Sequence, residues 1–318
     1  MPPPYGEIAD LLMKGEVVPF LGAGVNFGSR PAPNAKWSEK DSNFLPSGVE
    51  LSRFLADMSN FPAENEEEIT DLAKVSSYFV ETSARRRLRE RLHNIFDRDF
   101  EPASIHNYLA EMGRKTPLLI VTTNYDDLTE QAFNRLGLPF DLVVHPTDRK
   151  DVEASVLWWE HKAAEPEVVP PNQLYIDLKS TTVIYKMHGT VDRMTSKWDS
   201  YVITEDDYID FLSRMTGQTA VPAQFMRHFR TRHFLFLGYG LRDWNLRVVL
   251  KNLRTVLPTV DETKGRAGEE EDDSEELRSW AIQYKPSELE TELWNARKVK
   301  IYDVDINEFV EKMRARSL

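Results

Sequence analysis

The sequence predicts an α/β fold in which a parallel sheet is covered by helices on both faces, with a helical insertion after the first strand. Five short apolar runs have the length of buried strands, at residues 17–21, 118–122, 183–187, 234–237 and 299–304. Helical spacing of apolar residues occupies 49–58, 69–96, 106–112, 128–136 and 244–256. Strands that alternate with helices favour a parallel sheet with two covered faces.

The chain of 318 residues, with 41% hydrophobic content, can hold a large core. We expect one domain over residues 1–318. The stretch from about 26 to 116 is mostly helical and separates the first two strands, so it is predicted to form a cap beside the sheet. Residues 261–276 contain five consecutive acidic side chains and few apolar ones, which is typical of a solvated or disordered loop, with an acidic docking element as the alternative.

Composition excludes several classes of function. A net charge of -12, from 40 basic and 52 acidic residues, disfavours direct binding of nucleic acid. The sequence has no cysteine, which excludes disulfides, a thiol nucleophile and thiolate zinc sites, so no zinc is expected. The N-terminal residues lack the pattern of a signal peptide, and no apolar run approaches the roughly 20 residues that span a bilayer. A cytoplasmic protein without membrane contact is the expectation.

A glycine-rich turn follows the first predicted strand, at Gly22, Gly24 and Gly28. In this setting backbone N–H groups can hold a diphosphate, and glycine lets the chain come close to it. The spacing is one residue longer than the dehydrogenase fingerprint, and no acidic strand end follows about 20 residues later, which disfavours a nicotinamide oxidoreductase. A tight turn without a ligand is the alternative.

Polar or glycine-containing segments follow three further predicted strands. Thr123, Asn124 and Asp126 come after the second, His188-Gly189 after the third, and Gly238-Tyr239-Gly240 after the fourth. Because ligands of open α/β sheets bind at the carboxyl ends of the strands, these segments predict a shared site.

Together these segments resemble the sirtuin (SIR2) superfamily, and specifically the bacterial SIR2-like proteins of anti-phage defence, which degrade NAD. Gly22-Ala23-Gly24 looks like the phosphate loop, Thr123-Asn124-Tyr125-Asp126 like the Gln-Asn-Ile-Asp-type motif and His188-Gly189 like the catalytic His-Gly. Gly238-Tyr239-Gly240 resembles the ribose-and-phosphate turn, and Leu45-Pro46-Ser47-Gly48 is closer to the bacterial branch than to deacetylases. Asn26 and Gly240 stand where the family usually has serine.

The resemblance implies a Rossmann-like fold and an NAD+ glycohydrolase that takes NAD as its substrate. Asn124 is expected to position a water or bond a ribose hydroxyl, and His188 to bond the 2′- or 3′-hydroxyl and act as base. Asp126 is expected to contact the carboxamide or to fix its loop, and the alternative is that it caps the helix that begins near Leu128. The implied binding residues are Gly22, Ala23, Gly24, Asn26, Thr123, Asp126, Gly238, Tyr239 and Gly240.

Two other functions remain open. A non-catalytic module that binds NAD or ADP-ribose is the main alternative. The other is a protein deacylase or ADP-ribosyltransferase, and the deacylase is disfavoured because the zinc lobe of deacylating sirtuins uses four cysteines. The family also implies that activity is restrained until a homo-oligomer forms or a separate partner acts, such as a HerA-type ATPase or a short Argonaute.

The remaining basic side chains are predicted to be structural. His106 stands near a helix start and is interpreted as a packing or capping residue. His145 and His161 have no spacing typical of metal ligands. The run Arg85-Arg86-Arg87, with Arg89 and Arg91, is predicted to be a solvated helix face, and docking of an acidic partner is the alternative.

Overall fold

The computed structural model describes residues 2–32, 34–147, 149, 152, 154–217, 220–239, 279–295 and 298–317. Its strands are β1 (Val17–Leu21), β2 (Leu119–Thr122), β3 (Asp141–Val144), β4 (Val156–Trp159), β5 (Glu167–Val169), β6 (Val183–Lys186), β7 (Gly189–Thr190), β8 (Ser200–Tyr201), β9 (His233–Leu237), β10 (Ser279–Gln283) and β11 (Val299–Asp303). Among these described residues, nine strands form one sheet in the order β11-β10-β9-β1-β2-β6-β3-β4-β5, and β7 pairs with β8 in a second.

All five predicted strands are present and lie in parallel ladders as β1, β2, β6, β9 and β11. The predicted parallel sheet is confirmed, and at one edge it is extended by antiparallel pairing, because β4 is antiparallel to both β3 and β5. The connections there are too short for the helical crossover that parallel strands need. Pro19 lies within central β1 opposite Leu235, and the ladder with β2 begins only at the following residue, Phe20.

Four of the five predicted helical stretches are found in the described residues. Residues 69 and 70 end a short separate helix, and residues 72–96 form two helices because Ala84 adopts a φ of 84° between them. Predicted helix 244–256 and the acidic stretch 261–276 lie outside the described residues. The helices are α1 (Tyr5–Met13), the 3-10 helix η1 (Ala23–Ser29), α2 (Gly48–Ser59), α3 (Glu66–Thr70), α4 (Leu72–Ser83), α5 (Arg85–Phe96), α6 (Ser104–Gly113), α7 (Leu128–Arg135), α8 (Glu205–Thr216), α9 (Ala223–Thr231), α12 (Glu288–Asn295) and α13 (Ile306–Ser317).

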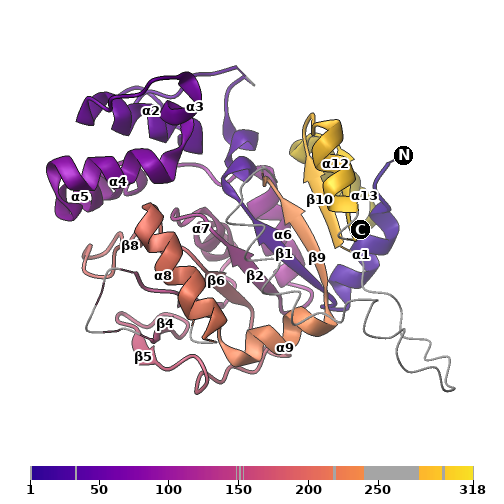
Figure 1. The fold of residues 1–318 in the computed structure, drawn as a ribbon. Coiled ribbons are helices and arrows are strands. Elements are labelled where there is room, and N and C mark those ends of the chain that lie inside the picture. Colours follow the sequence, from indigo (N-terminus) through magenta and orange to yellow (C-terminus); the bar gives the residue numbers. More distant parts are fainter. Residues whose placement is uncertain are drawn as a thin grey trace, which may run out of the picture.

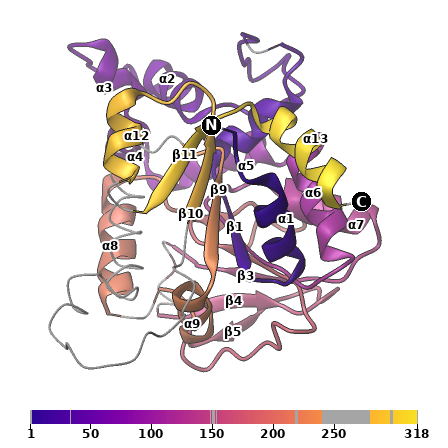
Figure 2. The same ribbon diagram turned by 90° about the vertical axis from the view of Figure 1, so that its right-hand side faces the viewer.

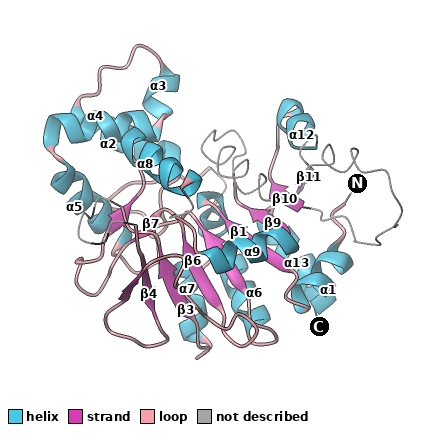
Figure 3. Ribbon diagram, turned by 60° about the horizontal axis from the view of Figure 1, so that its bottom comes forward, coloured by secondary structure: helices cyan, strands magenta, loops and turns pink. Residues whose placement is uncertain are grey.

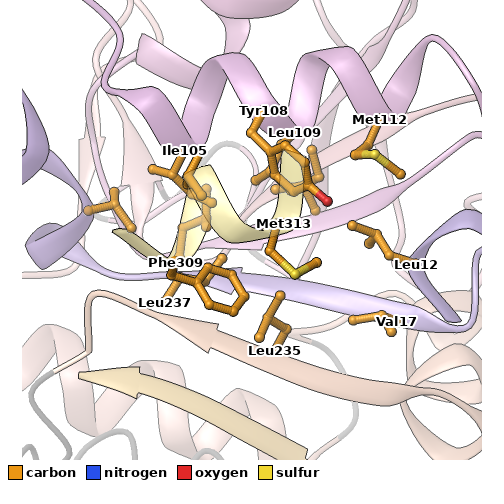
Figure 4. Packing of buried hydrophobic residues seen from close by; sticks show 14 of the residues in the cluster. Leu12, Val17, Ile105, Tyr108, Leu109, Met112, Leu235, Leu237, Phe309 and Met313 are labelled. Atoms are coloured by element: carbon orange, nitrogen blue, oxygen red, sulfur yellow. The ribbon is translucent and has the colours of Figure 1, made fainter. Parts of the chain in front are cut away.

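Helices cover both faces of the sheet. Successive residues of a strand point to opposite sides, so a central strand contributes side chains to the clusters on both faces. In β1, Val18 and Phe20 belong to the cluster that contains residues of α8, α9 and α12, whereas Val17 and Leu21 belong to the cluster of α1, α6, α7 and α13. Figure 2 shows these two helix groups on opposite sides of the strands, and Figure 3 shows the same layering from below. Figure 4 shows Leu12, Tyr108 and Phe309 converging on the strand residues of the second cluster.

A third cluster forms the core of the cap and contains residues of α2, α4 and α5. In Figure 1 helices α2 to α5 lie together at one end of the molecule. The following helix, α6, instead packs on the sheet through Ile105, Leu109 and Met112, so the cap proper ends with α5. Leu128 at the start of α7 and the loop residues Val191 and Ile203 join the cap cluster from beside the sheet, which seats the cap over the carboxyl ends of the strands. None of the described helices is both long and apolar enough to cross a membrane.

Candidate functional site

A pocket of about 730 Å³ lies between the cap and the carboxyl ends of β1, β2, β6 and β9. The starts of α2 and α4 form the cap side of its wall. Gly22 is not among the lining residues but contacts one of them, and Gly240 lies outside the described residues. The predicted site residues brought together in the lining are Ala23, Gly24, Asn26, Thr123, Asn124, Asp126, His188, Gly238 and Tyr239.

Asn124 follows β2 and is 7% exposed. Its backbone N–H donates to Thr122 Oγ1 at 3.0 Å, and its Nδ2 donates to the Gly22 carbonyl at 3.3 Å. The first bond fixes the backbone and the second orients the side-chain amide, whose Oδ1 is buried without a hydrogen-bond partner in the described part of the chain. The pocket therefore has an oriented amide oxygen in its wall.

His188 follows β6, the strand next to β2, and is also 7% exposed. The edges of Tyr208 and Phe211 pack on its ring, with centroids 5.5 and 5.2 Å away. Burial lowers the pKa of His188 to about 3, so the imidazole is neutral near pH 7. Its Nε2 is buried and has no hydrogen-bond partner among the described residues. A neutral imidazole can accept a proton or bond a hydroxyl group.

Asp126 combines two of the roles that the sequence left open. Its Oδ1 accepts from the Leu128 N–H at 3.2 Å at the start of α7, and its Oδ2 accepts from Asn26 Nδ2 at 2.9 Å. The carboxylate thus serves the helix start and also ties the loop after β2 to the turn after β1. Asn26 Oδ1 is buried without a partner in the described structure.

The glycines of the first turn face the chain itself. Gly24 N–H donates to Gly238 O at 2.8 Å, and a Cβ on Gly24 would lie only 2.5 Å from that oxygen. Gly238 has a φ of +66°, a region that favours glycine. These glycines thus allow two turns of the same chain to pack together, and the expectation that they also make room for a ligand stays a prediction.

The same explanation holds for Gly189, whose φ is +90° and whose missing Cβ would meet the backbone of Ser200 in β8. The backbone N–H groups of the first turn also bond within the protein. The N–H groups of Gly22, Gly24 and Val25 all donate to carbonyls of the protein. They are therefore not the donors that a phosphate loop of the expected kind would offer.

The structural interpretation of the other histidines agrees with their contacts. His106 Nδ1 accepts from the Ala103 N–H at 3.0 Å at the start of α6. The ring of His145 packs on Phe211, and that of His161 on Phe140. No group of three or more potential ligands for a metal ion occurs in the described ranges.

The basic run on α5 was predicted as a solvated face, and this is wrong for its first member. Arg85 donates to Asp207 Oδ2 at 2.7 Å and to the Tyr201 carbonyl at 2.8 Å, which ties the cap to the start of α8. Arg86 is exposed and pairs with Glu90 one turn away, as expected for a solvated face.

Sequence reasoning missed three contributors to the site. Tyr208 of α8 lines the pocket and packs on His188, but helix α8 itself was not predicted. Asp71, the N-cap of α4, lines the cap side of the pocket. Lys186 lies buried beneath the loop after β2, and a lysine in an otherwise apolar strand was a signal available in the sequence.

A family model described as a SIR2-like domain matches residues 118–302, more than half of the chain. The chain therefore belongs to the SIR2-like domain family. It resembles NAD(+) hydrolase ThsA of Acinetobacter baumannii, with 29% identity over 237 residues that cover 74% of this chain and 38% of that protein. It also resembles Defense-associated sirtuin 2 of Bacillus subtilis, with 22% identity over 249 residues, 78% of this chain and 20% of that protein.

The chain spans less than half the length of these two relatives. A solved structure from work on the mechanism and regulation of Sir2 enzymes aligns with 98% of this chain and 97% of the other, at 12% identity and a TM-score of 0.44.

Proposed function

We propose that this chain hydrolyses NAD+ to nicotinamide and ADP-ribose, as part of bacterial defence against phage. Membership of the SIR2-like domain family supports the proposal, as do relatives that carry the names NAD(+) hydrolase and defence-associated sirtuin. Activation by self-assembly or by a partner belongs to the proposal as well, since unrestrained loss of NAD would harm the host.

The observation that carries the proposal is that two residues lining one pocket, Asn124 and His188, each have a buried polar atom, Oδ1 and Nε2, without a partner among the described residues. A buried polar group without a partner costs about 1–3 kcal/mol, so two of them at adjacent strand ends indicate a site arranged for a polar ligand. The pocket volume of about 730 Å³ suits a ligand of the size of NAD. The two residues suit a ribose as ligand, because its hydroxyl groups can donate hydrogen bonds to Asn124 Oδ1 and to His188 Nε2.

The proposed reaction needs little acid catalysis. The bond between ribose C1′ and the nicotinamide nitrogen breaks, and both electrons go to the cationic ring, which leaves as neutral nicotinamide. The oxygen of a water molecule forms the new bond to C1′, and that water loses one proton. Asn124 Oδ1 accepts a hydrogen bond from the water or from a ribose hydroxyl. Neutral His188 uses Nε2 either to bond a ribose hydroxyl or to take the proton, which it then passes to solvent because its pKa is low.

Electrostatics in the pocket favour the charge that develops. The carboxylates of Asp71 and Asp126 are the only charged side chains among the described residues that line it. Their negative field stabilises a cationic ring in the bound substrate and the oxocarbenium-like transition state that follows.

The test is product analysis with purified protein and NAD. We expect nicotinamide and ADP-ribose in equal amounts, without any acyl-peptide, and we expect the rate per molecule to rise with protein concentration if self-assembly activates the chain. A His188→Ala preparation, purified in parallel, controls for contaminating host enzymes. Saturable NAD binding without cleavage, at every concentration and with proteins encoded beside it, would support the non-catalytic binding module instead.

A further inference from the structure

Lys186 is a fully buried cation directly beneath the candidate site. It is the last residue of β6, and its side chain has an exposed fraction of 0%. Its Nζ lies 2.8 Å from Glu130 Oε1, 2.5 Å from the Asp126 carbonyl and 3.2 Å from the Tyr125 carbonyl. An ammonium group has three donors, so these contacts account for all of them.

The two carbonyls belong to the turn that joins β2 to α7 and carries Asn124. Tyr125 O also accepts from the Val191 N–H, whereas Lys186 is the donor found for Asp126 O among the described residues. The other side of this turn is held by Asn124 Nδ2 on Gly22 and by Asn26 on Asp126. Hydrogen bonds therefore hold this turn from two directions. Lys186 of β6 holds it on one side, and Gly22 and Asn26 of the turn after β1 hold it on the other.

Stability alone does not explain a buried ion pair at this position. Moving both charges out of water costs several kcal/mol per ion, and apolar residues of similar volume often replace such pairs without loss of stability. The neighbouring residues of β6 are apolar and buried, so an apolar side chain would fit the same strand. What an apolar side chain cannot supply is a donor for the turn carbonyls.

We propose that Lys186, held by Glu130, is a positioning residue that fixes the backbone of residues 125–126 and so aims the Asn124 amide into the pocket. The inference rests on the proposed function, since the role of the turn is to place Asn124 for work on NAD. Lys186 itself does not line the pocket and touches no reacting atom.

The experiment compares three variants of the full chain. Lys186→Met removes the donors, Lys186→Met with Glu130→Met also removes the unpaired carboxylate, and Glu130→Gln keeps the lysine with its carbonyl contacts. For the double variant we expect a melting temperature near that of wild type, kcat reduced by roughly 10-fold or more, and an NAD Kd within about 3-fold. Glu130→Gln should keep most of its activity.

Two further measurements separate positioning from general damage. Met313→Ala, in α13 on the opposite face of the sheet, lowers stability by leaving a cavity and should leave kcat at a permissive temperature unchanged. Hydrogen exchange of amides 124–128 should be faster in the double variant than in wild type and in Met313→Ala. Unchanged exchange there, or wild-type kcat in the double variant, overturns the inference. A wild-type chain that never cleaves NAD overturns the proposed function, whatever the exchange result.

Discussion

The floor of the pocket has two halves of different construction. At the ends of β1 and β9, backbone packs on backbone, as the Gly24 N–H on Gly238 O shows. At the ends of β2 and β6, the side chains of Asn124 and His188 line the pocket, and each has a buried polar atom without a hydrogen-bond partner among the described residues. The difference indicates a division of work, in which the glycine half determines the shape of the site and the side-chain half carries its chemistry.

The largest effect is expected from truncation in the side-chain half. Asn124→Ala and His188→Ala should each reduce NAD turnover by roughly 10²-fold or more, the scale of a lost general base or electrostatic contact. NAD affinity should change much less, since each variant removes one polar contact of a large ligand. The measurement is kcat and Kd for each variant, with circular dichroism to verify the fold.

The double variant tests whether both side chains act on one ribose. Because they would then serve the same transition state, the combined loss should be well below the product of the single losses. Losses that multiply would place the two residues in separate steps. If both single variants fold and keep near-native turnover, these side chains do not carry the reaction, and the alternative of a non-catalytic binding module would have to be considered again.

The next effect concerns the glycine half. Gly24→Ala places a Cβ 2.5 Å from Gly238 O, and we expect a loss of stability toward the upper end of the ~1–3 kcal/mol typical of overpacking. Gly48→Ala is the matched control, because Gly48 also lines the pocket but has no atom within 4 Å of the added methyl group. Urea denaturation measures both. If Gly24→Ala were as stable as Gly48→Ala and lost only NAD affinity, the glycine would serve the ligand after all.

Buried neutral histidines predict a third effect, a loss of stability in acid. Burial lowers the pKa of His106 to about 4 and that of His145 and His188 to about 3. In the unfolded chain each titrates near 6.5, so between about pH 4 and 6.5 the unfolded state binds more protons. Stability is therefore full above pH 6.5 and falls as the pH drops, by up to about 1.4 kcal/mol per pH unit for each histidine.

His106→Asn isolates one of these contributions. The Asn oxygen can replace Nδ1 as acceptor for the Ala103 N–H, while the titrating ring is removed. The difference in unfolding free energy between pH 7 and pH 5 should shrink by roughly 1–2 kcal/mol relative to wild type. An unchanged difference would show that His106 does not titrate on unfolding in this range.

The contrast between central and edge strands explains what the sequence could predict of the fold. Strand β1 is buried along its whole length and reads as an uninterrupted apolar run. By contrast, the edge strand β5 has two exposed residues among its three. The short strand β3 lies further inside the sheet but begins with Asp141, whose carboxylate accepts from Trp158 Nε1, a partner that is known only once the chain is folded. Short strands with polar residues therefore escape a search for hydrophobic periodicity.

For the site, motif and position were sufficient to bring the predicted residues together, but not to explain each residue. The convergence of Asn124 and His188 follows from parallel strands that end at one edge. That Gly24 meets Gly238, that Arg85 reaches Asp207, and that Lys186 supports the turn after β2 depend on distances between segments far apart in the chain. Contacts of this kind produce no characteristic spacing of residues in the sequence, so they could not be predicted from it.

The smallest predicted effect concerns the contact between the glycine half and the side-chain half of the pocket floor, where Thr123 Oγ1 and Tyr239 OH lie 2.7 Å apart. Thr123→Val and Tyr239→Phe each remove one partner with little change in shape, and each should cost about 1 kcal/mol of unfolding free energy. Because the two act through one hydrogen bond, the double variant should cost no more than about 0.5 kcal/mol beyond either single variant. Tyr239 also packs on Phe20, with ring centroids 5.3 Å apart, and the Phe substitution preserves that contact. Strictly additive costs in urea denaturation would mean that the hydroxyls do not join the halves, and that the glycine turns are held to the side-chain half by packing alone.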